Sequence, residues 1–272
     1  MTKKTALITG ASSGIGRELA RIFAAEGYNL VLIARREERL QELSRELQKT
    51  PGIKILIIAK DLSIPASPEE IFREIKDRNM HIDVLVNNAG SQVYGLFAET
   101  DWCRELNLIQ TNLVSLTHLT KLFVTDMVKN GGGKILNVGS TGSFMPAPRN
   151  AIYCAAKAYV LNFSLGIAKD LEGTGITVTT LCPGATKTEF AGKANMENTL
   201  LFKMMVMDAV TVAKAGYKAL IKGKEVVVPG IANKLTVLLA RFLPRRVILG
   251  IGNIIMKPCN DHSPKPQMIG QR

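Results

Sequence analysis

A tyrosine and a lysine lie four residues apart in Tyr153-Cys-Ala-Ala-Lys157, within a predicted helical stretch. At this spacing both side chains project from one face of a helix. A phenol has a pKa of ~10 and needs help to exchange protons near neutral pH. An ammonium group one turn away favours the phenolate and supplies that help. Taken alone, the pair also fits a helix surface with no chemical role.

A serine, Ser140, precedes this pair by thirteen residues and lies just beyond the apolar segment 134–138. Its hydroxyl could orient a substrate carbonyl by hydrogen bonding. Together the serine, tyrosine and lysine indicate proton transfer to or from an oxygen-bearing substrate.

A glycine-rich turn, Thr9-Gly-Ala-Ser-Ser-Gly-Ile-Gly16, follows the first apolar segment. Gly10 permits a tight turn, Gly14 lets the backbone approach a pyrophosphate, and Gly16 lets the next helix pack on the strand. The spacing differs from the general Gly-x-Gly-x-x-Gly fingerprint, and a plain strand-to-helix turn is the alternative. Its position between a strand and a helix favours a dinucleotide site.

The second predicted strand ends in Ala34-Arg35-Arg36, where an NAD site would place an acid for the ribose hydroxyls. Guanidinium groups suit a 2′-phosphate, so the sequence predicts NADP(H). In the alternative, Glu37 and Glu38 bind the ribose and the arginines are solvated.

Short, almost continuously apolar segments alternate with amphipathic ones, as in a parallel sheet covered by helices on both faces. We expect an α/β fold, a doubly wound (Rossmann) sheet of about seven strands with ligands at the strands' carboxyl ends. Helices are expected at 14–26 and 37–48, with another starting at 67–70. The strands are expected at 5–9, 28–34, 54–59, 83–86, 134–138, 177–181 and 225–228.

The composition narrows the class of protein. The chain has 272 residues, 46% of them hydrophobic and 21% charged, with a net charge of +12, which excludes a disordered chain. No apolar run reaches the ~18–20 residues of a membrane span. Four cysteines without a Cys-x-x-Cys pair or a His cluster predict no metal site and a reducing, cytoplasmic location. The absence of a long Lys/Arg block argues against nucleic acid as a partner.

The chain is predicted to form a dinucleotide-binding and catalytic domain over 1–230 and a basic amphipathic extension over 231–272. The extension has two stretches of helical apolar spacing separated by Pro244, and it has no acid from Ile231 to Asn260. Three roles are open for it: packing on its own or a partner subunit, peripheral contact with anionic membrane, and part of the substrate entrance.

Five motifs occur here in the order and spacing of the short-chain dehydrogenase/reductase family: Thr9–Gly16, Asn87-Asn-Ala-Gly90, Ser140, Tyr153-x-x-x-Lys157 and Pro183-Gly-Ala-Thr186. The resemblance covers roughly residues 5–230. The stretch from Val228 to Leu235 is also similar to the tails of a bacterial branch related to 3-oxoacyl and 17β-hydroxysteroid reductases.

The resemblance implies a catalytic set. Tyr153 would exchange the proton, Lys157 would lower the tyrosine pKa and hold the nicotinamide ribose, and Ser140 would bind the substrate carbonyl. Asn112 matches the residue that holds a water relay, although an ordinary helix polar residue is the alternative. Gly139 departs from the many relatives that have a second serine there.

The resemblance also implies an NADP(H) site. Asp61 and Leu62 would contact the adenine, the 88–90 loop the adenosine ribose, and the loop after Pro183 the nicotinamide carboxamide. The cofactor-binding set is thus Gly10, Ser12, Ser13, Gly14, Ile15, Gly16, Arg35, Arg36, Asp61, Leu62, Asn88, Ala89, Gly90, Tyr153, Lys157, Pro183, Gly184, Thr186 and Thr188.

The expected activity is hydride transfer between NADP(H) and a ketone or secondary alcohol, in a homodimer or homotetramer. The alternative is a non-enzymatic NADP(H) sensor or membrane-associated binding protein on the same fold. A methionine-rich segment after Pro183 predicts a mobile lid over a lipophilic, 3-oxoacyl or steroid-like substrate, with an ordinary core helix as the alternative. Its residues are Phe190, Met196, Leu200, Leu201, Phe202, Met204, Met205, Val206 and Met207.

Overall fold

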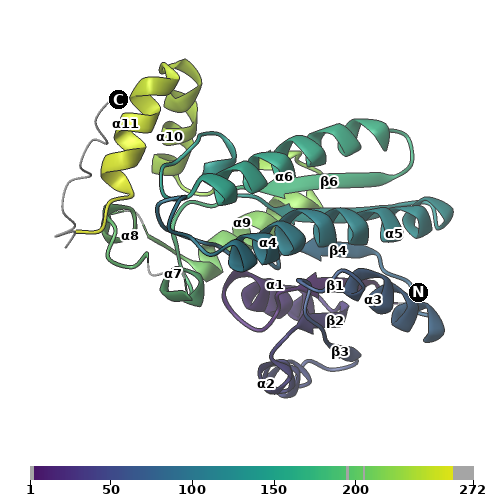
Figure 1. Cartoon of the computed structure of the whole chain (residues 1–272). Coiled ribbons are helices and arrows are strands. Elements are labelled where there is room, and N and C mark those ends of the chain that lie inside the picture. The colour runs from purple at the N-terminus through teal and green to yellow at the C-terminus, as the bar shows by residue number, and fades with distance from the viewer. Residues whose placement is uncertain (1–2, 194–195, 205, 260–272) are drawn as a thin grey trace, which may run out of the picture.

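The computed structural model describes residues 3–193, 196–204 and 206–259. Its centre is a seven-stranded parallel sheet with the strand order β3-β2-β1-β4-β5-β6-β9 (Figure 1). The predicted doubly wound sheet is therefore confirmed, and its strands begin and end within two residues of the predicted bounds. They are β1 (Thr5–Thr9), β2 (Asn29–Ala34), β3 (Ile55–Ala59), β4 (Val84–Asn87), β5 (Gly133–Val138), β6 (Ile176–Leu181) and β9 (Val226–Val227).

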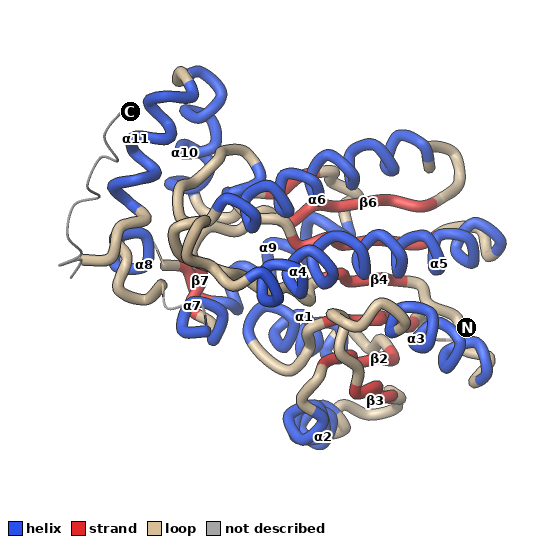
Figure 2. Tube along the Cα trace, viewed as in Figure 1, coloured by secondary structure: helices blue, strands red, loops and turns tan. Residues whose placement is uncertain are grey.

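Helices cover both faces of this sheet (Figure 2). Alternate residues of each strand point to opposite faces, so Ile8 joins one apolar core and Leu7 the other. The first core is completed by α1 (Gly14–Ala25), α2 (Glu37–Leu47) and α9 (Ala209–Ile221). The second is completed by α3 (Ser67–Asp77), α5 (Leu116–Lys129) and the C-terminal part of α6 (Ala151–Asp170). Both faces of each central strand are buried, which explains the continuous apolar segments in the sequence.

The helical region after β4 is interrupted by a π-helical segment. It begins with α4 (Trp102–Ile109), continues as π helix over Gln110–Ser115, and then runs into α5. A π segment inside an α-helix often lies at a functional site, and this one contains the predicted catalytic residue Asn112.

The remaining elements gather at the carboxyl edge of the sheet. A two-stranded sheet, β7 (Thr186–Lys187) and β8 (Met207–Asp208), was not predicted from the sequence, because two-residue strands have no detectable periodicity. The chain forms two short helices, α7 (Glu189–Lys193) and α8 (Leu200–Met204), between β7 and β8 in the sequence. The predicted C-terminal extension is helical, with α10 (Ile231–Phe242) and α11 (Arg245–Ile255) forming a hairpin.

One helix, α6, is long and apolar enough to cross a membrane by length and composition alone. This differs from the expectation drawn from apolar runs, since the helix includes charged residues such as Lys157 and Lys169. Its Val160, Leu161 and Ser164 are buried and it packs along β6, so we interpret it as a core helix of this fold.

A buried polar cluster ties β4, β5 and α6 together. Asn87 Nδ2 donates to Asn137 Oδ1 at 2.9 Å, and Asn137 Nδ2 donates to Ser164 Oγ at 2.9 Å. All three residues are almost fully buried. Removing one side chain from such a cluster leaves the remaining polar groups without a hydrogen-bond partner, because water cannot reach them.

We therefore expect Asn137→Ala to lower the free energy of unfolding by about 1–3 kcal/mol. The midpoint of urea denaturation measures this, and Thr125→Ala, at an exposed helix position, is the control. Equal midpoints for the two variants would contradict a stabilising role for the cluster.

Candidate active site

Hydrogen bonds join the loops that follow β1 and β4. Thr9 Oγ1 accepts from the backbone N–H groups of Asn88 and Ala89, both at 3.0 Å, and Asn88 Nδ2 donates to the Thr9 carbonyl at 2.9 Å. The order of the strands reverses between β1 and β4, and in doubly wound sheets ligands bind at such a switch point. A crevice accordingly opens there, lined by Asn88, Ala89 and Gly90.

The glycine turn forms the floor of this crevice. Gly10 and Gly14 have φ values of +66° and +55°, which favour glycine. A Cβ on Gly16 would lie 2.5 Å from the Gly10 carbonyl oxygen, so a side chain there has no room. Ser13 is the N-cap of α1 but makes no side-chain capping bond. The first turn of α1 therefore offers backbone N–H groups to an anion in the crevice.

The two arginines after β2 have different surroundings. Arg36 donates to Ser12 Oγ and Ser13 Oγ at 3.1 and 3.0 Å and forms an ion pair of 2.7 Å with Glu189 at the start of α7. Arg35 is 65% exposed and lies 3.5 Å from Asp61. The predicted phosphate-binding residues Ser12, Ser13 and Arg36 are thus in contact with one another.

The carboxylate of Glu189 was not singled out from the sequence, because it is 153 residues from its partner. Hydrogen bonds and charge from Arg36, together with Arg39, lower its pKa to about 2. It is therefore ionised near neutral pH and neutralises part of the positive charge of this end of the crevice.

The predicted catalytic residues converge on the same crevice. Ser140 starts the 3₁₀ turn Thr141–Ser143, where its Oγ accepts from the Gly142 N–H at 3.1 Å. Burial raises the pKa of the Tyr153 phenol, and a hydrogen bond with Ser140 opposes the shift. The Lys157 Nζ lies 5.7 Å from the centre of the Tyr153 ring.

The buried lysine also contacts the backbone around it. Lys157 Nζ donates to the Val138 carbonyl at 2.8 Å, and burial lowers the pKa of its ammonium to about 8. Asn112 is buried beside it, with its amide paired to the backbone of Ser91 through two hydrogen bonds of 2.9 Å. Gly90 separates the two, because a Cβ there would lie 3.3 Å from Asn112 Oδ1 and 3.7 Å from Lys157 Nζ.

The departure at Gly139 has a local explanation. A Cβ at this position would lie 3.0 Å from Cys182 Sγ, 3.1 Å from Ser143 Oγ and 3.2 Å from Thr180 Cγ2. In this protein Cys182 therefore takes up the space that a second serine would need.

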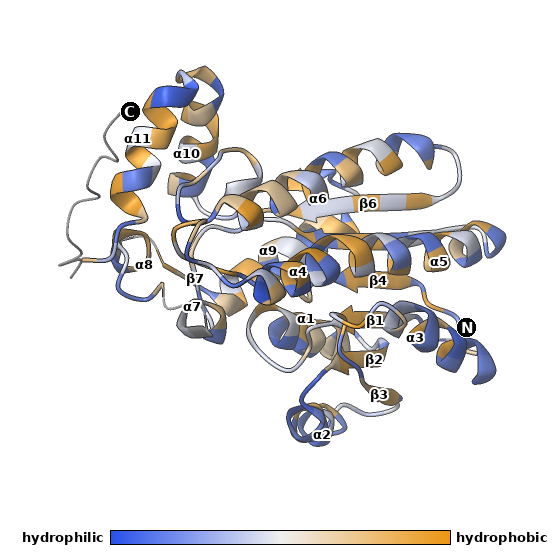
Figure 3. Cartoon of the chain, viewed as in Figure 1, coloured by the Kyte–Doolittle hydropathy of each residue, from blue (hydrophilic) through white to orange (hydrophobic). Residues whose placement is uncertain are grey.

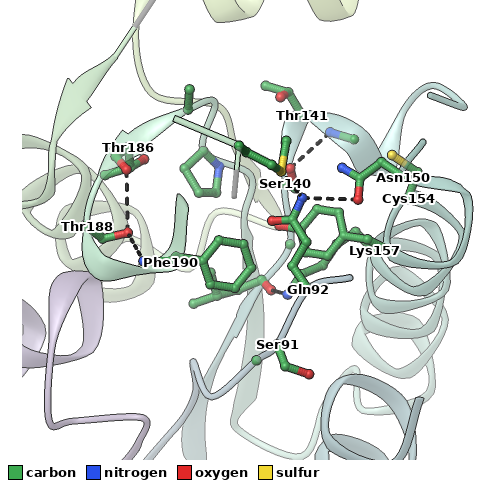
Figure 4. Close-up of a pocket in the computed structure, with 18 of the residues that line it drawn as sticks. Ser91, Gln92, Ser140, Thr141, Asn150, Cys154, Lys157, Thr186, Thr188 and Phe190 are labelled. Carbon is green, nitrogen blue, oxygen red and sulfur yellow. Dashed lines mark hydrogen bonds between the residues drawn. The ribbon is translucent and has the colours of Figure 1, made fainter. Parts of the chain in front are cut away.

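A cavity of about 740 Å³ connects the glycine turn to the C-terminal hairpin. Figure 4 shows Thr186, Thr188 and Phe190 on one side of it and Asn150, Cys154 and Lys157 on the other. The Phe190 ring lies 5.8 Å from the Tyr153 ring. Every residue of the predicted cofactor-binding and catalytic sets lines this cavity except Gly16 and Asn112, which lie directly behind its wall.

The inner side of the C-terminal hairpin supplies an apolar wall that the sequence motifs did not identify. Its lining residues are Thr236, Leu239, Ala240, Leu243, Ile248, Ile251, Gly252, Ile255 and Met256. Asn233 of α10 anchors the hairpin: it donates to the Pro229 carbonyl at 2.8 Å, and its Oδ1 would lie 2.3 Å from a Cβ on Gly184. Forming part of the substrate entrance is one of the three roles that the sequence leaves open for this extension.

The residues of the methionine-rich segment lie in different surroundings. Phe190, Met196, Leu201 and Phe202 line the cavity, and Met196 packs against Met256 of the C-terminal region. Met207 instead packs against the first core, and Val206 is exposed. Met205 lies outside the described residues. The mobile lid stays a prediction.

Polar groups in the cavity were also missed by the motif search. Gln92 Nε2 donates to Asn150 Oδ1 at 3.0 Å on the cavity wall. Their positions depend on the packing of two loops far apart in the chain. Within the described residues, no cluster of three His, Cys, Asp or Glu side chains could hold a metal ion.

Comparison with known proteins agrees with this geometry. The family model described as short chain dehydrogenase matches residues 4–199. The chain belongs to the short-chain dehydrogenase/reductase family. The resemblance drawn from five motifs is thereby confirmed.

Relatives extend the match beyond the motifs. This dehydrogenase is 36% identical to an Escherichia coli NADP-dependent 3-hydroxy acid dehydrogenase over 65% of this chain and 71% of the relative. A Sphingobium yanoikuyae short-chain dehydrogenase, solved in complex with NADPH, shares 33% identity with a TM-score of 0.79, covering 88% of this chain and 93% of that one. A bulky-bulky ketone specific alcohol dehydrogenase from Comamonas testosteroni shares 30% identity with a TM-score of 0.75, covering 89% and 93%.

The lowered pKa of Lys157 predicts a pH dependence of stability. An unfolded lysine titrates near 10.4, so between pH 8 and pH 10 the unfolded dehydrogenase binds more protons than the folded one. The contribution of this residue to the free energy of unfolding should therefore rise by about 2 kcal/mol from pH 8 to pH 10.

Denaturant midpoints of wild type and Lys157→Met at both pH values measure this rise. The wild type should gain more stability than the variant, which has no ammonium to titrate. Parallel pH profiles for the two proteins would contradict a buried lysine of low pKa.

Proposed function

We propose that this dehydrogenase reduces a bulky, lipophilic ketone to a secondary alcohol with NADPH, or catalyses the reverse reaction. One observation supports this most strongly: a single cavity joins an anion-binding glycine turn and two arginines to Ser140, Tyr153 and Lys157. Its far end is apolar, so the substrate that enters it has to be largely apolar as well.

The residues present fit NADP(H). The Cβ-free positions Gly10 and Gly14 leave room for a pyrophosphate against the N-terminus of α1. The guanidinium groups of Arg35 and Arg36, with the hydroxyls of Ser12 and Ser13, suit a 2′-phosphate. The relatives described as NADP-dependent and as bound to NADPH support the same choice. When bound, the cofactor supplies the hydride.

The side chains around the carbonyl supply orientation and the proton. Ser140 would donate a hydrogen bond to the carbonyl oxygen, and Tyr153 would donate its proton to that oxygen as the alcohol forms. Burial raises the pKa of the phenol, so the proton is in place at neutral pH but is held more tightly, and the hydrogen bond with Ser140 opposes that shift. The buried Lys157 ammonium faces the ring and would stabilise the phenolate that results.

A bulky substrate is supported by the two apolar walls. One consists of Phe190, Met196, Leu201 and Phe202, and the other is the inner side of the hairpin. Methionine side chains adapt to irregular shapes, so the cavity could accept an acyl chain or a fused-ring ketone. The relative specific for bulky-bulky ketones has the same fold at 30% identity.

Assembly and location complete the proposal. Exposed apolar side chains lie on α4, α5 and α6, among them Trp102, Leu106, Val128 and Tyr159. We propose that two or four copies associate through these helices in the cytoplasm.

Binding and turnover of the protein test the assignment together. Arg36→Ala should weaken NADPH binding about 10- to 100-fold, because a charged hydrogen-bonding partner of the 2′-phosphate is lost, while NADH binding changes little. Arg35→Ala should act in the same direction. Fluorescence titration with both nucleotides measures the effect.

Tyr153→Phe should lower kcat for ketone reduction by about 100-fold or more and leave NADPH affinity nearly unchanged. A panel of ketones and 3-oxoacyl thioesters should show turnover rising with apolar bulk. Turnover restricted to small hydrophilic ketones would contradict the substrate class, and equal affinity for NADH and NADPH would contradict the cofactor.

The ion pair between Arg36 and Glu189 predicts a further change in affinity. The carboxylate competes with the 2′-phosphate for the guanidinium, so Glu189→Gln should strengthen NADPH binding about three- to fivefold. NADH affinity should not change. Glu42→Gln, with the same charge change at an exposed position of α2, is the control. An equal gain in both variants would indicate a general charge effect.

A further inference from the structure

The C-terminal hairpin exposes an unusual amount of apolar surface. Ten of the 22 exposed large hydrophobic residues found in the described part of the chain lie between Ile231 and Ile254. Figure 3 shows hydrophobic residues on both α10 and α11, at the end of the molecule towards which the strands point. Only Asn233 on α10 and Ile248 on α11 are buried.

Part of this exposed apolar surface forms a stripe on α10 that does not line the cavity. On α10, Ile231, Leu235, Leu238 and Phe242 follow the spacing i, i+4, i+7 and i+11, so they lie on one face of the helix. Their exposed fractions run from 48% to 79%, and none of them lines the cavity. The opposite side of α10 carries the cavity-lining residues. Each side of this helix is therefore apolar, and only the inner side has a partner within the described chain.

Cations accompany this stripe. Lys234, Arg241, Arg245, Arg246 and Lys257 are exposed, and no Asp or Glu occurs between Ile231 and Asn260. No ion pair joins any of these five cations to another described residue at 4.0 Å or less. An apolar stripe flanked by long basic side chains is the pattern of a helix that lies in a membrane interface, with the cations reaching the headgroups.

A second copy of this chain is a poorer partner for the surface. In a two-fold contact the same face meets itself, so the cations of both copies would be brought together without any acid between them. The exposed apolar residues of α4, α5 and α6 lie on other elements and are free for self-association. An anionic bilayer provides negative charge for the cations of the hairpin and an apolar interior for its exposed stripe.

We propose that the α10–α11 hairpin docks this enzyme on anionic membrane surfaces, with the outer stripe of α10 in the interface and the cations on lipid phosphates. The inner side of the same hairpin forms a wall of the cavity. Docking would therefore place the substrate entrance next to the bilayer, the phase in which a lipophilic ketone concentrates. This last step rests on the proposed function; docking itself does not.

Flotation of the full chain with vesicles tests the proposal. The protein should float with vesicles of equal amounts of phosphatidylglycerol and phosphatidylcholine, and weakly or not at all with pure phosphatidylcholine. Arg241→Gln/Arg245→Gln/Arg246→Gln should weaken binding by about fivefold for each charge removed. Lys214→Gln/Lys218→Gln/Lys222→Gln, with the same loss of charge on and just after α9, is the control and should bind nearly as well as wild type.

The apolar stripe is tested separately. Leu238→Ser/Phe242→Ser should float poorly, whereas Phe97→Ser removes an equally exposed phenylalanine elsewhere (72% against 79%) and should float like wild type. None of the substituted residues lines the cavity, so turnover of a water-soluble ketone should be unchanged in every variant. This readout distinguishes failure of docking from failure of the proposed activity.

Three results would overturn docking. They are absence of wild-type protein from the floated anionic vesicles, equal weakening by the α9 control, and a stripe variant that changes the oligomeric state in sedimentation while flotation is unaffected. The last would assign the stripe to contact between copies.

Discussion

The reversal of strand order between β1 and β4 is the constraint on which the rest of the structure depends. At that point the loops after the two strands diverge to opposite sides, and a crevice is unavoidable. Here the Thr9 hydroxyl and the Asn88 amide hold the two loops together at its base. The glycine turn, the 88–90 loop and the 3₁₀ turn at Ser140 then occupy fixed positions around it.

A buried ammonium group is an energetically costly feature of the molecule. Lys157 is withdrawn from water, which lowers its pKa, and its Nζ donates a hydrogen bond to the Val138 carbonyl. Such a group stabilises the fold less than an apolar residue would. Its position beside the Tyr153 ring, between the 88–90 loop and β5, is therefore better explained by chemistry than by stability.

The fold and the crevice could be predicted because their determinants are local. Each of these determinants is contained within a short stretch of sequence. They are the continuously apolar strands, the glycines at the turn after β1 and the Tyr153-x-x-x-Lys157 spacing. The carboxylate of Glu189, the anchor Asn233 and the Gln92–Asn150 pair could not be predicted, since their partners are far away in the sequence. The π-helical segment around Asn112 was also missed, because one extra residue in a helical turn leaves the apolar pattern almost unchanged.

The close packing of Asn233 on Gly184 joins the base of the hairpin to the loop that borders the catalytic crevice. This contact links a surface inside the crevice to a surface outside it. If a molecule in the crevice changes the preferred angle of α10, then whatever touches the outside of α10 must change the affinity for that molecule by the same factor. The inner side of the hairpin faces the cavity and its outer side faces the surroundings, so any such coupling between the two sides is reciprocal.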